Sequence, residues 1–373
     1  MRKSKIVFIS FVVLFVCMLN TANYTVGGAS ISNNTSISAI DAELVFSLPS
    51  NSTSKFNLGD SANVYKIGSK LIVLSTVPLK GGDKTVKPYK EVAYKYMYII
   101  NINEEVSKVV TTISAIQIPS KSAVSIKDNL IFVNKDNALP KNYLVNEKDL
   151  VDLKKLYKCK STNGITKVRY DYAEALKQMF IGAKSQGNYN FICNSGYRSL
   201  EYQQQLFNAI LKDNLAIYKD KDKALKMTKL RVAYAGTSEH NLGIALDIFQ
   251  YPNCNSDTFG STKEAKWLKE NCYKYGFIVR YPANKTALTY TMYEPWHIRY
   301  VGLPYSKLFQ NSGLCFEEIV QKLRKDNYIF MSDEKDKYIL FYSKTSNLYC
   351  PKDNNIQRSI LTHNNEYVTL IKL

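Results

Sequence analysis

Histidine is scarce in this sequence, and two of the three histidines lie close to acidic residues. Among 373 residues, the histidines are His240, His297 and His363. Asp247 follows the first of them by seven positions, and Glu294 precedes the second by three. Imidazole nitrogens and carboxylate oxygens are zinc ligands, and a nearby carboxylate that does not bind the metal can move protons. These residue types are those of a metal-dependent hydrolytic site.

The sequence around Asp247 predicts how its carboxylate is presented. Apolar residues at positions 244, 246 and 248 alternate with the other positions, which is typical of a strand with one apolar face. Asp247 then projects from the opposite face. It needs a partner or a metal there, because burying a bare carboxylate is costly. The small residues Gly243 and Ala245 leave room beside the backbone.

The second acidic segment predicts a strand that brings in the other histidine. Pro295 favours an extended conformation for Glu294, and His297 then enters an alternating strand. A zinc hydrolase needs three protein ligands, an open position and a carboxylate that is not a ligand. An ordinary hydrogen bond would explain either segment alone, but both occur in one histidine-poor region. We therefore predict His240, Asp247 and His297 as zinc ligands and Glu294 as the proton shuttle.

Arg198 lies where a predicted strand turns into a helix, in the sequence Ser195-Gly-Tyr-Arg-Ser. A guanidinium held there can stabilise an oxyanion or bind a carboxylate. Gln203, about one helical turn further on, offers another donor. Alone, Arg198 is compatible with an ordinary surface cation, and the adjacent predicted zinc site is what favours a functional role.

The elements that must position these residues belong to a region of mixed helices and short strands, residues 139–304, which predicts an α+β domain. One helix presents the apolar face Ala173–Ala183 and ends near Gly187, and another runs from about Leu200 to Asn214. A third begins at a capping box, Ser261–Glu264, and ends at Gly276. Short strands are predicted at Phe191–Cys193, Phe277–Tyr281 and Ile298–Val301.

Two flanking regions have strand-like sequences. Residues 61–138 predict a small β-rich module, either a wall-binding or spacer module or a plain structural one. Its predicted strands are Leu71–Val77, Tyr96–Ile100, Val109–Ile113 and Leu130–Val133. Residues 305–373 predict a C-terminal extension with one helix followed by strands. These are the helix Phe316–Arg324 and the strands Tyr338–Tyr342, Ser359–Thr362 and Tyr367–Ile371.

The first 29 residues have the pattern of an export signal. Positive charges precede Ile6–Leu19, an apolar run of 14 residues that is shorter than the ~20 of a membrane-spanning helix. We expect residues 1–29 to be a signal peptide or a retained membrane anchor, followed by a flexible linker at residues 30–60.

Cys254 and Cys272 flank one short segment, and they predict either a disulfide or two buried thiols.

The chain is strongly basic, with a formal net charge of +18. Removal of residues 1–29 takes away three positive charges and no acidic ones, which leaves +15 on the exported chain. An anionic partner is therefore expected. Export argues against nucleic acid and favours anionic cell-wall polymers, so we expect the protein at the extracellular face of the membrane or in the wall.

Three segments together resemble the VanY-type D-alanyl-D-alanine carboxypeptidase family, which belongs to the LAS zinc peptidases. The matching sequences are Ser195–Ser199 (SGYRS), Ser238–Asp247 (SEHNLGIALD) and Glu294–Gly302 (EPWHIRYVG). The resemblance covers about residues 139–304 and leaves the two flanking regions outside it. It implies a LAS-type domain with a small antiparallel sheet and flanking helices.

The resemblance also implies roles for individual residues. His240, Asp247 and His297 would bind one Zn²⁺ per chain, and Glu294 would be the catalytic acid and base. Arg198 would stabilise the tetrahedral intermediate and, with Gln203 and Ser238, contact the substrate. The implied enzyme is a zinc carboxypeptidase that releases C-terminal D-alanine from peptidoglycan stem peptides or precursors. We expect it to be a monomer.

Two alternatives remain open at this point. One is an L,D-carboxypeptidase or a cell-wall endopeptidase of the same family. The other is a non-catalytic wall-binding protein in which zinc is structural, and the intact Glu294 argues against it.

Overall fold

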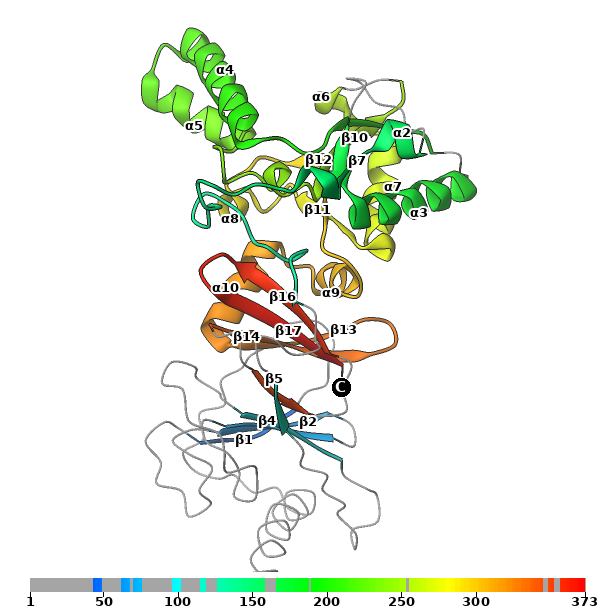
Figure 1. Cartoon of the computed structure of the whole chain (residues 1–373), viewed down its shortest axis with the longest axis vertical. Coiled ribbons are helices and arrows are strands. Elements are labelled where there is room, and N and C mark those ends of the chain that lie inside the picture. Colours follow the sequence, from blue (N-terminus) through cyan, green and yellow to red (C-terminus); the bar gives the residue numbers. More distant parts are fainter. Residues whose placement is uncertain are drawn as a thin grey trace, which may run out of the picture. The chain divides into compact units, whose positions relative to one another are not determined.

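The computed structural model (Figure 1) divides into two compact units, which we describe separately. The site unit comprises Lys127–Lys322 and Ser359–Asn364, and the β unit comprises Met1–Ile126, Leu323–Arg358 and Asn365–Leu373. The structure describes residues 43–48, 62–67, 70–75, 96–101, 115–118, 126–157, 166–187, 189–252, 255–344, 348–351 and 356–372.

A four-stranded antiparallel sheet forms the centre of the site unit. The strand order is β11-β12-β10-β9, with adjacent strands antiparallel throughout. The strands are β9 (Phe191–Ser195), β10 (Ala245–Gln250), β11 (Phe277–Tyr281) and β12 (Glu294–Tyr300). All four contain a predicted strand or overlap one, and the mixture of this sheet with helices confirms the α+β class.

The two faces of this sheet differ as the alternating sequence requires. Leu246, Ile248 and Ile298 are fully buried in the main apolar core, together with residues of two helices, α3 (Tyr170–Gly187) and α7 (Lys263–Asn271). Asp247 and His297 occupy the intervening positions of β10 and β12, directly opposite each other across the ladder. The core face therefore holds the sheet in place, and the other face carries the polar residues.

The helices begin and end close to the predicted positions. Helix α3 buries Ala173, Leu176, Met179 and Ala183, as expected from the apolar spacing. Helix α7 continues as the 3-10 turn η3 (Cys272–Tyr275), which ends at Gly276 as predicted. The predicted capping residue was wrong by one position.

Thr262, and not Ser261, caps helix α7. Its hydroxyl accepts a hydrogen bond from the backbone N–H of Ala265. Ser261 instead donates its backbone N–H to the carbonyl of Thr258 in the preceding turn.

Helix α4 (Leu200–Tyr218) is longer than predicted and pairs with a helix that the sequence reading missed, α5 (Lys221–Arg231). The two form a helical hairpin that projects from the sheet (Figure 1). A buried hydrogen bond joins them, from Asn214 Nδ2 to Thr228 Oγ1 at 2.9 Å. Few apolar residues mark α5, because most of its surface faces solvent.

The predicted strand Leu130–Val133 is wrong, although all four of its residues are buried. The segment is irregular, and a side chain binds its backbone: Arg299 Nη2 donates to the carbonyl oxygens of Asn129 and Ile131 at 3.0 and 2.9 Å. An apolar run can satisfy its carbonyl groups with a buried arginine instead of a neighbouring strand.

The β unit contains several small sheets. One is a four-stranded antiparallel sheet in the order β1-β2-β3-β4, and β5 pairs with β15. These strands are β1 (Glu43–Leu48), β2 (Ala62–Ile67), β3 (Lys70–Ser75), β4 (Tyr96–Asn101), β5 (Ala115–Ile118) and β15 (Leu348–Pro351). Strand β1 lies within the range predicted as a linker, although its sequence, ELVFSL, is mostly apolar.

The C-terminal region has the predicted helix followed by strands. Helix α10 (Phe316–Asp326) is followed by four strands that, together with β6 from earlier in the chain, form a five-stranded sheet in the order β13-β14-β17-β16-β6. The strands are β6 (Ile126–Lys127), β13 (Tyr328–Ser332), β14 (Lys337–Ser343), β16 (Ile356–Thr362) and β17 (Glu366–Lys372). Strand β13 was not predicted. The domain boundaries proposed from the sequence stay predictions.

Short elements complete the described chain. They are η1 (Glu147–Asp149), β7 (Leu150–Asp152), α2 (Leu153–Tyr157), β8 (Lys167–Arg169), η2 (Glu239–Leu242), α6 (Ser256–Phe259), α8 (Thr286–Thr289) and α9 (Tyr305–Ser312).

Several sequence-based expectations fall outside the described residues. The predicted signal or anchor at residues 1–29, the strand Val109–Ile113 and Cys254 all lie there. Within the described part of the chain, no helix is both long and apolar enough to cross a membrane. Cys272 is a buried free thiol, as in the second of its two predicted alternatives.

Two glycines with left-handed backbones give a matched test of packing in the site unit. Gly276 has a φ of 92°, and an added Cβ would lie 2.7 Å from the Tyr300 ring and 3.2 Å from Gly302 Cα. Gly313 has a φ of 63° with nothing within 4 Å of that position. We expect Gly313→Ala to cost about 1 kcal/mol of unfolding free energy, and Gly276→Ala about 1–3 kcal/mol more through overpacking. Equal losses in denaturant titrations would contradict this packing.

Candidate metal centre and active site

His240 is carried by a tight turn rather than by a regular strand. The turn η2 begins at Ser238, whose hydroxyl accepts a 3.3 Å hydrogen bond from the His240 backbone N–H. It ends at Gly243, which has a φ of 71° and donates its N–H to the His240 carbonyl. The His240 ring places Nδ1 2.7 Å from the carbonyl oxygen of Gly196. This contact leaves Nε2 as the free ligand atom.

The other two predicted ligands face each other across the sheet. Asp247 on β10 pairs in register with His297 on β12. Asp247 Oδ1 lies 3.2 Å from His297 Nδ1 and 3.4 Å from His240 Nε2. The two imidazole rings stand nearly perpendicular, with centroids 4.9 Å apart. All three residues are buried, and the structure brings together the whole predicted ligand set.

This donor set fits a zinc ion. Ligand atoms at about 2.0–2.1 Å from a tetrahedral metal are about 3.3–3.4 Å from one another, close to the two distances from Asp247 Oδ1. The candidate ligand atoms of the three residues all lie within 4.8 Å of one another. Asp247 Oδ1 is buried and has no partner with hydrogen-bond geometry among the described residues. A buried carboxylate oxygen without such a partner is suited to a cation.

The electrostatic environment keeps two of the ligands in metal-binding form. Burial, reinforced by the Arg198 charge, lowers the pKa of His240 to about 4, so this ring is neutral at pH 7. Burial alone would raise the pKa of Asp247, but His240, His297 and Arg198 hold it well below its usual range. A neutral imidazole and an ionised carboxylate are the forms that bind a metal.

His297 differs from His240 because it faces two carboxylates. Burial opposes its protonation, but Asp247 and Glu239 raise its pKa to about 9. Its Nε2 lies 3.4 Å from Glu239 Oε2. A metal ion bound at Nδ1 takes the place of a ring proton, so His297 would exchange its positive charge for the metal's charge.

Glu294 lies beside the ligand cluster without completing it. Glu294 Oε2 is 3.7 Å from His297 Nδ1. Burial raises the pKa of Glu294 to about 8, although the charge of His297 opposes this shift. A carboxyl group with a pKa near neutrality can both accept and donate a proton, as the predicted shuttle requires.

The Arg198 guanidinium donates three hydrogen bonds within the site. Its Nη2 donates to Asp247 Oδ2 at 2.9 Å, its Nε to Ser195 Oγ at 2.8 Å, and its Nη1 to Gln203 Oε1 at 3.3 Å. Gln203 is buried and donates to the carbonyl of Ala233 at 2.7 Å. Arg198 and Gln203 therefore lie at the metal cluster, and the three bonds use three of the five guanidinium N–H groups.

The remaining predicted residues have different surroundings. Ser238 is buried and caps the His240 turn, which gives it a structural contact in addition to the implied substrate contact. His363, the third histidine, packs against Tyr143 with ring centroids 5.2 Å apart and is not part of the cluster.

The sequence reading missed the residues that support the ligands. Glu239 is buried behind His297, and Gly196 accepts from His240. The Glu239 carboxylate binds Arg280 and Arg299, both at 2.8 Å. These two cations overcome the effect of burial and hold the pKa of Glu239 well below its usual range. The sequence does place Arg280 and Arg299 among apolar residues of predicted strands. However, nothing in their distance from Glu239 along the chain predicts that they contact it.

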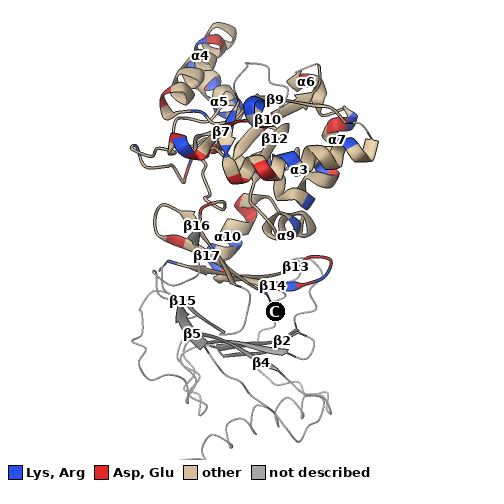
Figure 2. Ribbon diagram, turned by 45° about the vertical axis from the view of Figure 1, so that its right-hand side comes forward, with Lys and Arg blue, Asp and Glu red and all other residues tan. Residues whose placement is uncertain are grey.

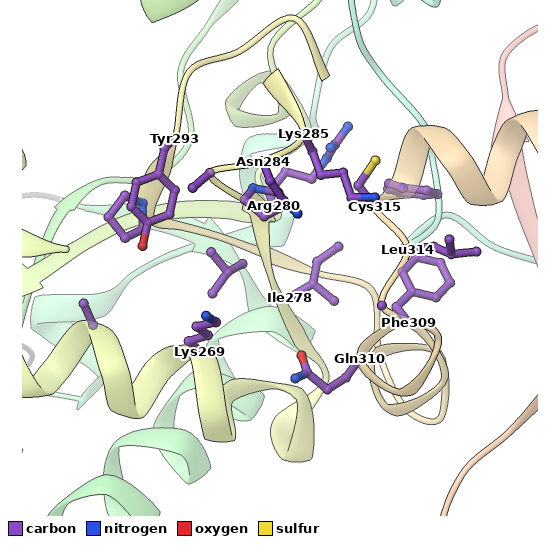
Figure 3. A pocket seen from close by; sticks show the side chains of 17 residues that line it. Lys269, Ile278, Arg280, Asn284, Lys285, Tyr293, Phe309, Gln310, Leu314 and Cys315 are labelled. Carbon is purple, nitrogen blue, oxygen red and sulfur yellow. The ribbon is translucent and has the colours of Figure 1, made fainter. Parts of the chain in front are cut away.

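A separate pocket of about 500 Å³ contains none of the seven predicted site residues (Figure 3). Tyr293 and Pro295, the neighbours of Glu294, line part of it, and Lys269 and Lys285 are also in its wall. Lys285 is paired with Glu318 at 2.8 Å. Because the pocket lacks a set of metal donors, we assign the chemistry to the histidine and carboxylate cluster.

Comparison with known proteins agrees with the geometry. The family model for VanY, D-alanyl-D-alanine carboxypeptidase, matches residues 165–303. The carboxypeptidase YodJ of Bacillus subtilis (strain 168) is 41% identical over 198 residues, which cover 52% of this chain and 68% of that protein. A D-alanyl-D-alanine carboxypeptidase of Enterococcus faecium is 34% identical over 202 residues, which cover 52% of this chain and 60% of that protein.

Solved structures also match this chain. The vancomycin resistance D,D-dipeptidase VanXYg, in complex with a D-Ala-D-Ala phosphinate analogue, has a TM-score of 0.53 at 26% identity and covers 70% of this chain and 99% of its own. VanYB in complex with D-alanine-D-alanine has a TM-score of 0.44 at 34% identity and covers 52% of this chain and 97% of its own. Given the sequence match to YodJ and to the VanY family model, the chain belongs to the VanY-type D-alanyl-D-alanine carboxypeptidase family of LAS zinc peptidases.

Proposed function

We propose that this protein is a zinc-dependent D,D-carboxypeptidase that removes the C-terminal D-alanine from peptidoglycan stem peptides or precursors. The observation that carries the proposal is the position of Glu294 beside the three-ligand cluster, with its Oε2 3.7 Å from His297 Nδ1. Three buried ligands and an adjacent carboxylate outside the ligand set are the parts of a catalytic zinc site. We further propose that the protein is exported and acts as a monomer with one zinc ion.

His240, Asp247 and His297 would hold the metal, which supplies Lewis acidity and lowers the pKa of water when bound. Glu294 accepts the proton of the attacking water and then donates it to the amine of the departing D-alanine. Arg198 has N–H groups beyond its three internal bonds, and these stabilise the negative charge that develops on the scissile carbonyl oxygen. Gln203 and Ser238 contact the substrate's terminal residue.

Two alternatives differ from this proposal in chemistry. An L,D-carboxypeptidase or an endopeptidase of the same family would use the same zinc site on another bond. A non-catalytic wall-binding protein with structural zinc would have no use for Glu294, whose burial carries a desolvation cost. The placement of Glu294 supports an enzyme.

The metal assignment predicts one zinc per chain, lost when a ligand is removed. In His240→Ala, an imidazole ligand disappears and the two remaining ligands bind zinc weakly. The exposed His363→Ala variant is the control, because it removes a histidine outside the cluster. Elemental analysis should give near-stoichiometric zinc in the wild type and the control, and little in His240→Ala. Full zinc content in His240→Ala would refute the assignment.

The proton shuttle predicts a loss of turnover without a loss of metal. Glu294→Gln keeps the side chain's size but removes the group that accepts the proton, so D-alanine release should fall by about 10²–10⁴-fold. Zinc content should stay unchanged, because Glu294 is outside the ligand set. Glu264→Gln, at another buried glutamate on α7, is the control. Activity of zinc-loaded Glu294→Gln within a few-fold of wild type would contradict the mechanism.

We also propose that α5 is the surface that binds anionic wall polymers. Five of its 11 residues are basic and one is acidic. Lys223, Lys226, Lys229 and Arg231 are exposed, and none of them has an ion pair among the described residues. Figure 2 shows the ribbon with basic residues in blue, including those of α5. The charge of Arg231 acts on Glu294, so the end of the helix lies near the site. A polyanion along α5 would hold stem peptides close to the catalytic centre.

Two lysine triplets with the same spacing test this surface. Changing Lys223, Lys226 and Lys229 together to Gln removes three charges from α5, and the same change at Lys263, Lys266 and Lys269 removes three from α7. Only the α5 variant should lose binding to purified cell walls, by several-fold at low salt, with wild-type binding weakening as salt is added. Both should hydrolyse a soluble stem peptide normally. Equal loss in the two variants would mean that only net charge matters.

A further inference from the structure

A buried network of four charged side chains stands directly behind His297. Glu239, Arg280, Arg299 and Glu317 are each at most 3% exposed. Arg280 donates two hydrogen bonds to Glu317, at 2.8 and 2.6 Å, and a third to Glu239. Burying four charges has a large desolvation cost even when they are paired. The reaction described above uses none of them, so their retention calls for an explanation.

The two oxygens of the Glu239 carboxylate have different partners. Arg280 Nε and Arg299 Nη1 both donate to Oε1, each at 2.8 Å. Oε2 points instead to His297, 3.4 Å from its Nε2. The opposite ring nitrogen, Nδ1, faces Asp247 Oδ1 at 3.2 Å. The arginines therefore hold the carboxylate in an orientation that leaves one oxygen for the imidazole.

We propose that Glu239 is the positioning residue for His297. Its Oε2 accepts the Nε2–H of the ring, which fixes the tautomer with a lone pair on Nδ1 and aims that lone pair at the metal position. The inference rests on the proposed zinc site. A metal-binding histidine commonly donates its second N–H to an acceptor, and loss of that acceptor typically weakens metal affinity by about 10–100-fold.

The neighbouring ligand shows the same arrangement with another acceptor. His240 Nδ1 lies 2.7 Å from the Gly196 carbonyl oxygen, which leaves its Nε2 for the metal. His240 is thus oriented by the main chain, whereas His297 depends on a side chain and on the two arginines that hold it. Arg299 is fixed in turn by the carbonyl oxygens of Asn129 and Ile131.

The network supplies a matched pair of variants. Glu239→Gln removes the charge that faces His297, and Glu317→Gln removes the other negative charge of the network, which contacts Arg280 and not the histidine. Both variants leave an excess positive charge buried, so both should unfold at lower temperature than the wild type. Only Glu239→Gln should change the metal centre.

Metal affinity separates positioning from a structural role. In chelator competition with the full chain, we expect Glu239→Gln to bind zinc about 10–100-fold more weakly and Glu317→Gln to stay within about three-fold. The visible absorption spectrum of the Co²⁺-substituted protein should change in Glu239→Gln alone. Equal zinc affinities, or equal losses in both variants, would overturn the inference.

A second variant covers the case in which Glu239→Gln does not fold. Glu239→Asp keeps a negative charge between the arginines but shortens the side chain by one methylene, which withdraws the acceptor from His297. It should also weaken zinc binding and alter the Co²⁺ spectrum. Failure of the wild type to bind zinc would refute the proposed function instead, so the two failures are distinguishable.

Discussion

The site depends on one buried carboxylate, that of Asp247. Its Oδ2 accepts a hydrogen bond from Arg198, and its Oδ1 faces His240 and His297 without forming a hydrogen bond to either. His240, His297 and Arg198 together keep the carboxylate ionised against the effect of burial. Because Oδ1 has no hydrogen-bond partner in the described part of the chain, it is available to a metal ion. The elements of the site unit bring partners to this carboxylate: β12 supplies His297, the η2 turn supplies His240, and the segment after β9 supplies Arg198.

The alternation of the central sheet separates stability from chemistry. One face of β10 and β12 contributes fully buried apolar residues to the core with α3 and α7. Ionisable groups lie at the other face, and burial shifts their pKa values in opposite directions. The pKa of Glu294 on β12 is raised to about 8, whereas the pKa of His240 on η2 is lowered to about 4. Burial drives both shifts, because a low-dielectric environment favours the neutral form of each group. The core therefore fixes the register that the site requires.

Much of the site was predictable because its residues carry local signals. His240, Asp247, His297 and Glu294 stand in short segments with strand or turn patterns, and the structure brings them together. Glu239 had no such signal, since its partners Arg280 and Arg299 are about 40 and 60 positions away in the sequence. Only the folded sheet reveals that a glutamate beside a ligand on η2 lies behind the next ligand on β12.

Two of the errors in the fold also involve contacts between distant segments. Leu130–Val133 has the sequence of a strand, yet the side chain of Arg299 binds the carbonyls around it. Helix α5 has too few apolar residues for a periodic pattern, and it is held by α4 through the buried pair Asn214 and Thr228. In both cases the observed structure includes a polar contact with a residue from another segment, and local sequence patterns do not reveal such contacts.

Product analysis on a defined pentapeptide stem tests the central claim most directly. The zinc-loaded protein and a chelator-treated sample would be incubated with the same peptide, and the products would be identified by mass spectrometry. The account predicts release of a single D-alanine and a tetrapeptide, only in the zinc-loaded sample. Release of a dipeptide, cleavage at an internal bond, or D-alanine release that survives complete zinc removal would contradict it.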